Sequence, residues 1–299
     1  FMEATFFAVM FFGWEKDSKR THLVATWMTG IGAAISAIWI LIANSWMQHP
    51  VGMEFNPDTV RHEMVDFWAL VLNPVAVSKF FHSWFSGWMT GAIFVIGISC
   101  WYLLKKRETR FELASIRVAG IVGIIGTLAL MFSGDNSGVN AAKYQPMKLA
   151  AAEGLEQGGK GMALSIVPGI EIPNLLSVLA THDFDGYVPG VQDLLNGYVD
   201  GEGVSHPSAE EKIERGKVAL QAFKEYRTLK DSNPDEAMKA RQTLEENVAY
   251  FGYGYIDQPE ELVPNVPLVY WSFRVMVGLG GFLLLLMCVV LWAEWKGKI

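Results

Sequence analysis

Three residues inside apolar stretches have the types and spacing that redox chemistry needs: His82, Met276 and Arg274. Asn73-Pro74 is a typical helix start, which places His82 roughly 12 Å along a helix at about 1.5 Å per residue. A second start at Asn265 places Met276 roughly 15 Å along another helix. Imidazole and thioether form a known axial pair for low-spin haem iron, so their similar depth suggests one haem site.

Each of these residues also has an ordinary structural explanation. His82 alone is explained as well by a hydrogen bond to a neighbouring helix, and most of the 13 Met residues must simply pack. Arg274 favours the haem hypothesis, because a buried guanidinium needs an anion and a haem propionate is one. Its alternative is snorkelling, in which the guanidinium reaches the interface between membrane and water.

An acid and a hydroxyl inside two other apolar stretches suggest a proton path. Glu3 lies well inside the first stretch, and acids within a membrane tend to line paths for protons or ions. Ser36 in the next stretch could extend such a path. The alternatives are a structural pairing for Glu3 and, for Ser36, the usual hydrogen bond to its own helix.

Composition places the chain in the membrane class. Apolar residues make up 51% and charged residues only 18%, whereas soluble domains average about a quarter charged. The apolar residues also cluster in long runs, which is the stronger membrane signal. Nucleic-acid binding would need a basic patch, and the net charge is −7. Cys100 and Cys288 lie in apolar runs, which excludes a disulfide framework, and no Cys-x-x-Cys pair suggests zinc or covalent haem.

The apolar runs predict membrane-spanning helices of about 20 residues each, preceded by the tail of another. The chain starts inside an apolar run without a basic leader, so we expect a cut through a helix and a missing part before Phe1. Gly and other small residues recur in the later helices, which is typical of close helix packing in membranes. The predicted helices are Phe1–Phe12, Leu23–Trp46, Pro74–Leu104, Ser115–Phe132 and Val266–Trp292.

The charges between these helices predict their orientation. Lys and Arg gather in alternate connections, and basic connections stay in the cytoplasm. The acidic connection around residues 54–66 and the long stretch 134–265 therefore fall outside. The basic residues are Lys16, Lys19 and Arg20, then Lys105, Lys106, Arg107 and Arg110, then Lys296 and Lys298.

The long outside stretch is expected to be functional or a small extra domain rather than a linker. Ser208 with Glu211 predicts a capping box that opens a helix running to Lys230. Asn233-Pro234 predicts the start of a second helix, toward Tyr250.

The predicted fold class is an all-α integral membrane protein, a transmembrane helix bundle with a long, partly helical extracytoplasmic loop domain. Transmembrane helices, the first one truncated, occupy 1–133. The loop occupies 134–265, and a last transmembrane helix with a cytoplasmic tail occupies 266–299.

Five short blocks of sequence, spread over nearly the whole chain, form a specific pattern. They are Ala43–Gly52 (ANSWMQHPVG), Leu72–Ala76 with Lys79–His82 (LNPVA, KFFH), Gly134–Gly138 (GDNSG), Gln145–Gly154 (QPMKLAAAEG) and Phe273–Met276 (FRVM). In content and order they resemble the haem-bearing subunit I of cytochrome bd-type quinol oxidases. The family's N- and C-terminal helices are not in this sequence, so the resemblance implies a fragment, and the loop length resembles that of the long-loop subtype.

The resemblance implies a haem set and its ligands. His82 and Met276 would be the axial ligands of the iron of a low-spin haem b, with Arg274 beside it. A high-spin haem b and a haem d would take their axial ligands from the family's helices outside this fragment.

The resemblance also implies a quinol site and a proton path. Lys148 and Glu153 would bind quinol in the outside loop, although without the family they read as an ordinary solvated pair. Glu3, with Ser36 beside it, would lie on the proton path to the high-spin haems. The family often has a hydroxyl where Ala4 follows Glu3, which weakens that relay.

The implied activity is that of an electrogenic quinol:oxygen oxidoreductase of aerobic respiration in the bacterial cytoplasmic (inner) membrane. Quinol would be oxidised at the outer face, electrons would pass through the low-spin haem to the high-spin haems, and oxygen would be reduced to water, contributing to proton motive force. The implied partners are subunit II, small accessory subunits, ubiquinol or menaquinol, and oxygen.

Two other functions fit parts of the pattern. A b-type cytochrome that anchors a dehydrogenase commonly uses two His ligands, so His49 or His62 would have to partner His82, and both are expected in loops. A transporter would often show repeated halves with broken helices, and the sequence has no such repeat.

Overall fold

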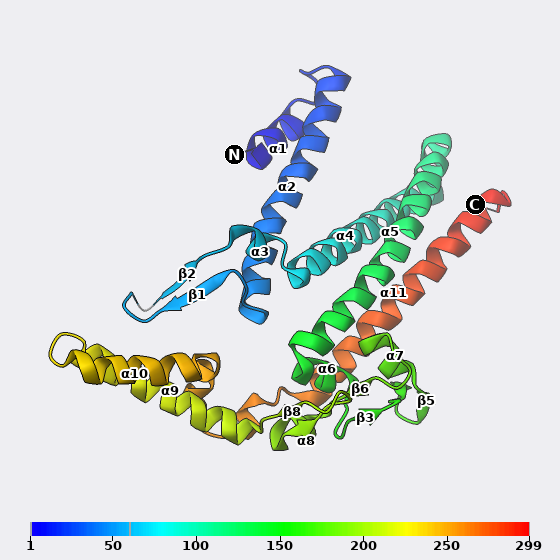
Figure 1. Cartoon of the computed structure of the whole chain (residues 1–299). Helices are drawn as coiled ribbons and strands as arrows, with labels where there is room; N and C mark the ends of the chain where they lie inside the picture. The colour runs from blue at the N-terminus through cyan, green and yellow to red at the C-terminus, as the bar shows by residue number, and fades with distance from the viewer. Residues whose placement is uncertain (1, 60, 299) are drawn as a thin grey trace. The chain divides into compact units, whose positions relative to one another are not determined.

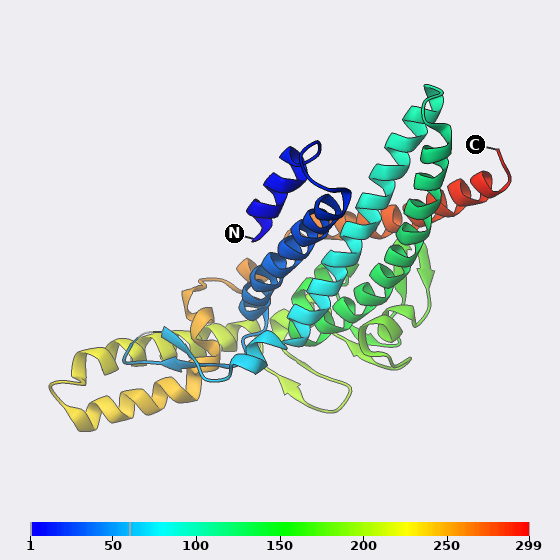
Figure 2. The same cartoon turned by 90° about the horizontal axis from the view of Figure 1, so that it is seen from above.

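The computed structural model, drawn in Figures 1 and 2, describes residues 2–59 and 61–298. The chain divides into two compact units. The first unit comprises Phe1–Gly52, Asp66–Ser137 and Leu286–Ile299. The second comprises Met53–Val65 and Gly138–Leu285. Each unit is described separately below.

Four helices in the described residues are long and apolar enough to cross a membrane, as the sequence predicted. They are α2 (Lys19–Gln48), α4 (Pro74–Leu104), α5 (Thr109–Tyr144) and α11 (Val266–Trp295). The first unit also contains two short helices, α1 (Met2–Phe12) and α3 (Phe67–Val71), whereas α11 belongs to the second unit as far as Leu285. Ser18 caps α2 by accepting from Thr21 N at 3.1 Å, and Asn73 caps α4 by accepting from Val75 N at 2.9 Å.

Helix α5 is longer than predicted, so the expected loop start at residue 134 lies inside a helix. Three polar side chains beyond Phe132 bond to carbonyls of their own helix: Ser133 to Leu130 O, Asn136 to Phe132 O and Ser137 to Ser133 O. These bonds satisfy the side chains without breaking the backbone ladder. The apolar run ends at Phe132, and hydropathy detects only this end. The helix itself continues for about three more turns, and these residues, Ser133–Tyr144, form its polar extension.

Glycines bring the helices of the first unit close together. Ala92, Ile96, Ala119 and Met287 form a buried cluster between α4, α5 and the end of α11. A Cβ atom added at Gly123 would overlap the Met287 sulfur. Small residues at such crossings are typical of membrane helices, because they let the backbones approach.

A helical hairpin forms part of the second unit. Helices α9 (Ala209–Leu229) and α10 (Pro234–Asn247) lie side by side, and the 3₁₀ helix η1 (Val248–Tyr255) packs on α9 (Figures 1 and 2). Both predicted starts are confirmed: Ser208 accepts from Glu211 N at 3.1 Å, and Asn233 accepts from Glu236 N at 3.5 Å.

A β-hairpin from another part of the chain packs on this helical hairpin. Strands β1 (Met53–Asn56) and β2 (Arg61–Met64) pair antiparallel. The Phe55 ring lies 6.1 Å from that of Phe223 and 5.6 Å from that of Phe251. Tyr226 on α9 donates its hydroxyl hydrogen to Asp58 at 2.5 Å.

The rest of the second unit mixes short helices with two-stranded sheets, so the all-α prediction was too narrow. Gly169, with φ of 91°, turns the chain between the paired strands β4 and β5, and left-handed residues of this kind favour glycine. Strands β3 and β6, and β7 and β8, also pair antiparallel. The elements are α6 (Pro146–Glu153), β3 (Gly159–Lys160), β4 (Leu164–Val167), β5 (Ile170–Ile172), α7 (Leu175–Thr181), β6 (Tyr187–Val188), α8 (Val191–Asn196), β7 (Tyr198–Val199), β8 (Ser205–His206) and η2 (Pro259–Leu262).

Replacement of Gly216 on α9 should destabilise the helical hairpin. The methyl group of Gly216→Ala would overlap the Gly254 nitrogen and the Tyr250 carbonyl, which are backbone atoms that cannot rotate away. We expect a loss of about 1–3 kcal/mol, measured as faster amide hydrogen exchange across α9 and η1. Gly252→Ala is the control, because its added carbon meets nothing within 4 Å. Equal exchange in both variants would contradict this packing.

Candidate functional site

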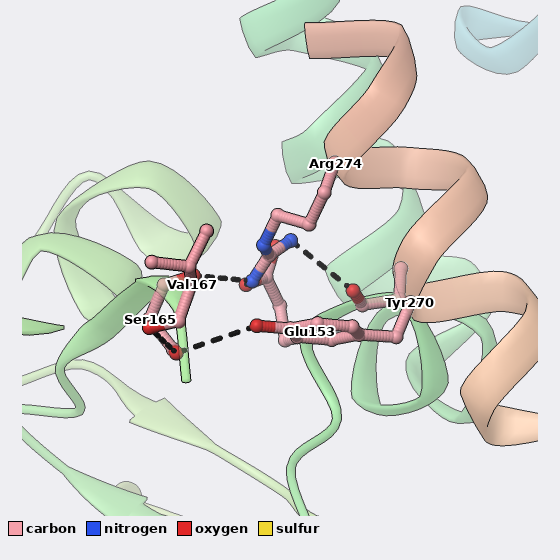
Figure 3. Close-up of polar contacts among 6 residues, drawn as sticks. Glu153, Ser165, Val167, Tyr270 and Arg274 are labelled. Carbon is pink, nitrogen blue, oxygen red and sulfur yellow. Dashed lines mark hydrogen bonds and ion pairs between the residues drawn. The ribbon is translucent and has the colours of Figure 1, made fainter. Parts of the chain in front are cut away.

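A buried ion pair joins the end of α6 to α11 (Figure 3). Arg274 Nη2 donates to Glu153 Oε2 at 2.8 Å, and the two side chains are 11% and 5% exposed. The same guanidinium donates to two backbone carbonyls, to Ala152 O at 3.2 Å through Nη1 and to Ser165 O at 2.6 Å through Nη2. One side chain of α11 therefore binds both the end of α6 and strand β4.

Two aromatic rings of α11 line the guanidinium. Its central carbon lies 4.4 Å from the ring centre of Tyr270 and 5.4 Å from that of Phe273. The Tyr270 hydroxyl lies 3.5 Å from Ser165 Oγ, and either oxygen can donate. Rings over a desolvated cation add an electrostatic attraction, which here favours one orientation of Arg274.

Gly154 allows α6 to end against α11. Its φ of 65° is left-handed, and Leu155 N donates to Ala150 O at 2.8 Å, which closes the helix with the six-to-one bond of a Schellman motif. A Cβ atom at residue 154 would lie 3.1 Å from the Tyr270 ring. Glycine is therefore needed here for both its φ angle and its size, and it places Glu153 at the last turn of α6.

The environment of Glu153 shifts its proton affinity. Burial raises the pKa of the Glu153 carboxyl, while the hydrogen bond and the positive charge of Arg274 act in the opposite direction. The net result is a pKa above the ordinary value. A buried carboxyl of this kind is suited to proton exchange nearer neutral pH than an exposed Glu.

The interpretation of Lys148 and Glu153 as a solvated pair is wrong. Lys148 is exposed on α6, whereas Glu153 is buried and paired with Arg274. The expected anionic partner of Arg274 is thus supplied within the chain by a residue 121 positions away. Sequence reasoning did not find Ser165 or Tyr270, because neither belongs to a motif and both are recognised only by their contact with Arg274.

One nitrogen of the Arg274 guanidinium makes no hydrogen bond within the described residues. This nitrogen, Nε, is buried. An unsatisfied buried donor costs about 1–3 kcal/mol, so the site has the chemistry to accept one more anionic or carbonyl oxygen.

His82 on α4 is held by the polar extension of α5. Its Nδ1 lies 3.4 Å from Ser133 Oγ, and Ser133 donates its own hydrogen to Leu130 O at 3.0 Å. With that hydrogen on Leu130 O, the Ser133 oxygen can accept from Nδ1–H, and this tautomer of His82 leaves Nε2 with the lone pair that a metal ion would need. A Cβ atom at Gly134 would lie 3.3 Å from His82 Cε1, so the glycine leaves room for the ring.

The remaining predicted residues have fewer contacts. Met276 lies on α11 with 52% of its surface exposed. Glu3 on α1 and Ser36 on α2 are exposed, and neither side chain makes a hydrogen bond within the described residues. His82 belongs to the first unit and Met276 to the second, so their shared ligation stays a prediction. Of the predicted site residues, the structure brings together Glu153 and Arg274.

Comparison with known proteins covers the whole chain. The family profile described as "Cytochrome bd terminal oxidase subunit I" matches residues 1–299. The chain is similar to cytochrome bd-II ubiquinol oxidase subunit 1 of Escherichia coli (strain K12), with 37% identity over 331 residues. It is also similar to cytochrome bd ubiquinol oxidase subunit 1 of Bacillus subtilis (strain 168), with 32% identity over 311 residues.

The chain is shorter than these relatives. Both alignments include 100% of this chain but only 61% and 54% of the respective relatives. Among solved structures, the bd oxidase from Geobacillus thermodenitrificans has a similar fold, with a TM-score of 0.57 and 20% identity. That match covers 100% of this chain and 76% of the other.

Proposed function

Because this chain belongs to the family of cytochrome bd terminal oxidase subunit I, we propose that it is part of a quinol oxidase that reduces oxygen to water. Four long apolar helices lie in the part of the chain that the structure describes, and the chain is a multi-pass membrane protein of this family. Two quinols would supply four electrons and release four protons, and one oxygen molecule would consume four of each. We place quinol oxidation at Glu153 and Lys148 on α6, and we propose subunit II and small accessory subunits as protein partners.

The buried pair of Glu153 and Arg274 is the observation that carries this proposal. Quinol oxidation needs an acceptor for the hydroxyl protons, and Glu153 is a buried carboxyl whose pKa is raised. Its second oxygen, Oε1, makes no hydrogen bond within the described residues, so it has the capacity to accept one from a quinol hydroxyl. The exposed Lys148 on the same helix would add a positive charge near the quinol oxygens.

We also propose that this chain binds a low-spin haem b, which would supply one-electron redox chemistry when bound. His82 presents Nε2 while Ser133 holds Nδ1, Met276 offers a thioether on an exposed face, and Arg274 Nε lacks an acceptor such as a propionate oxygen. A hydrogen bond on the second ring nitrogen orients a His ligand and makes it more basic. The ligands of a high-spin haem b and a haem d would come from outside this chain.

The proton path stays a prediction from the resemblance. Glu3 and Ser36 would carry protons from the cytoplasmic side toward oxygen. The two alternative functions, a dehydrogenase anchor and a transporter, lose their support with the family match over residues 1–299.

Loss of the Met276 sulfur should change the low-spin haem spectrum. Met276→Leu keeps apolar volume but removes the thioether, so the haem should become high-spin or dissociate, and His82→Ala should abolish the same signal. The measurement is the reduced-minus-oxidised spectrum of the complete oxidase. Met238→Leu, at an exposed Met on α10, is the control. An intact low-spin signal in Met276→Leu would remove Met276 as a ligand and favour a cytochrome with two His ligands.

Loss of the Glu153 carboxylate should impair quinol oxidation and spare the haems. Glu153→Ala removes the proposed proton acceptor, so quinol-driven oxygen uptake should fall roughly 100-fold while haem content stays normal. Glu156→Ala, at an exposed acid close by in the chain, should behave as wild type. Unchanged oxygen uptake, or a defect explained by haem loss, would argue against a quinol site at Glu153.

The stretch 134–265 should face the outside of the cell. Basic connections on the other side of the helices support this orientation. Trypsin added to right-side-out membrane vesicles should then cut at the exposed Lys230, in the turn between α9 and α10. Cleavage in inverted vesicles alone would reverse the assignment.

A further inference from the structure

Arg274 donates to three oxygens that come from two separate segments of the chain, the end of α6 and strand β4. Ala152 O and Glu153 Oε2 belong to the end of α6, and Ser165 O belongs to β4. The planar guanidinium reaches all three because its two terminal nitrogens point in different directions. A lysine ammonium carries a similar charge but lacks this fork.

The second segment is tied to α11 at one further point. The Tyr270 hydroxyl lies 3.5 Å from Ser165 Oγ, and Tyr270 is also the ring that supports the guanidinium (Figure 3). Strand β4 pairs antiparallel with β5, and Ser165 lies opposite Glu171 in this two-stranded sheet. The position of this two-stranded sheet against α11 thus depends on the same residues that hold Glu153.

We propose that Arg274 is the positioning residue for quinol oxidation: it fixes the Glu153 carboxylate and strand β4 against α11, so that quinol meets an acceptor already in place. This inference rests on the proposed function, which assigns quinol to Glu153. It gives Arg274 a role beyond neutralising a haem propionate. It also adds Ser165 and Tyr270 to the structure that supports the quinol site.

Removing Arg274 should act on quinol through Glu153. A carboxylate left buried without its cation is strongly disfavoured, so it would take up a proton or turn away from its site. Preorganised contacts lower the cost of binding, and their loss appears first in the affinity for substrate. The expected effect is therefore a rise in KM for quinol, with Arg274→Lys failing to restore the wild-type value.

The test uses the complete oxidase with Arg274→Gln, Glu153→Gln and the double variant. Arg274→Gln should raise KM for quinol about tenfold or more. The KM of the double variant should be no higher than that of the single variant with the larger defect, because both substitutions remove the same interaction. Effects that multiply in the double variant would show that Arg274 does not act through Glu153 and would overturn the proposal.

A second measurement does not depend on turnover. Amide hydrogen exchange in strand β4 should rise in Arg274→Gln and in Arg274→Lys, because the bond to Ser165 O is lost or weakened. Arg241→Gln is the matched control, since Arg241 pairs with Glu245 at 2.8 Å on α10, where its side chain is 40% exposed. If exchange in β4 stays at the wild-type level in both Arg274 variants, the positioning role is overturned. This outcome holds whether or not Arg274→Gln retains its haem.

The two possible failures are distinguishable. Normal quinol oxidation in Glu153→Gln would remove the proposed function of this site, whatever Arg274 does. A defect in Glu153→Gln together with a normal KM in Arg274→Gln would remove only the role of Arg274.

Discussion

A guanidinium removed from water needs hydrogen-bond acceptors. At Arg274 this requirement holds the end of α6 and strand β4 against α11. A buried Arg without partners would be strongly destabilising, so the chain around it must deliver oxygens. Glu153 delivers a carboxylate, while Ala152 and Ser165 deliver carbonyls. These contacts need α6 to approach α11 closely, and Gly154 permits that approach.

A comparable dependence exists in the first unit, where polar side chains extend α5. Ser133 follows the apolar run directly, and its bond to Leu130 O keeps it within the helix. The helical geometry then presents its oxygen to His82 on α4. Had the chain left the helix at Phe132, as the apolar pattern suggests, no hydroxyl would hold the imidazole from this direction. The polar extension of α5 therefore supports the proposed iron ligand.

Local signals predicted much of the fold, because each acts over a few residues. Ser208 and Asn233 begin helices as expected, since their side chains accept from backbone N–H groups three residues later. The apolar runs predicted the four long helices. The end of α5 and the short strands were missed, because they depend on side-chain bonds and glycine turns that hydropathy does not detect.

The candidate site was predicted by residue type but not by partner. Arg274 was expected to need an anion, and Glu153 was identified from its sequence block, yet nothing local links two residues 121 positions apart. Their pairing is a tertiary contact. The common depth of His82 and Met276 rests on helix starts alone, and it stays a prediction, because the two residues belong to different units.

Burial, rather than residue type, gives the Glu153–Arg274 pair its importance. Arg241 and Glu245 form an ion pair of the same chemistry, but their side chains are 40% and 60% exposed. Water and salt screen such a pair, and it contributes about 0–1 kcal/mol. Arg274 and Glu153 are both removed from water, so their attraction is little screened and neither charge is tolerated alone. An Arg and a Glu in the sequence thus say little about function until the fold determines whether they meet inside it.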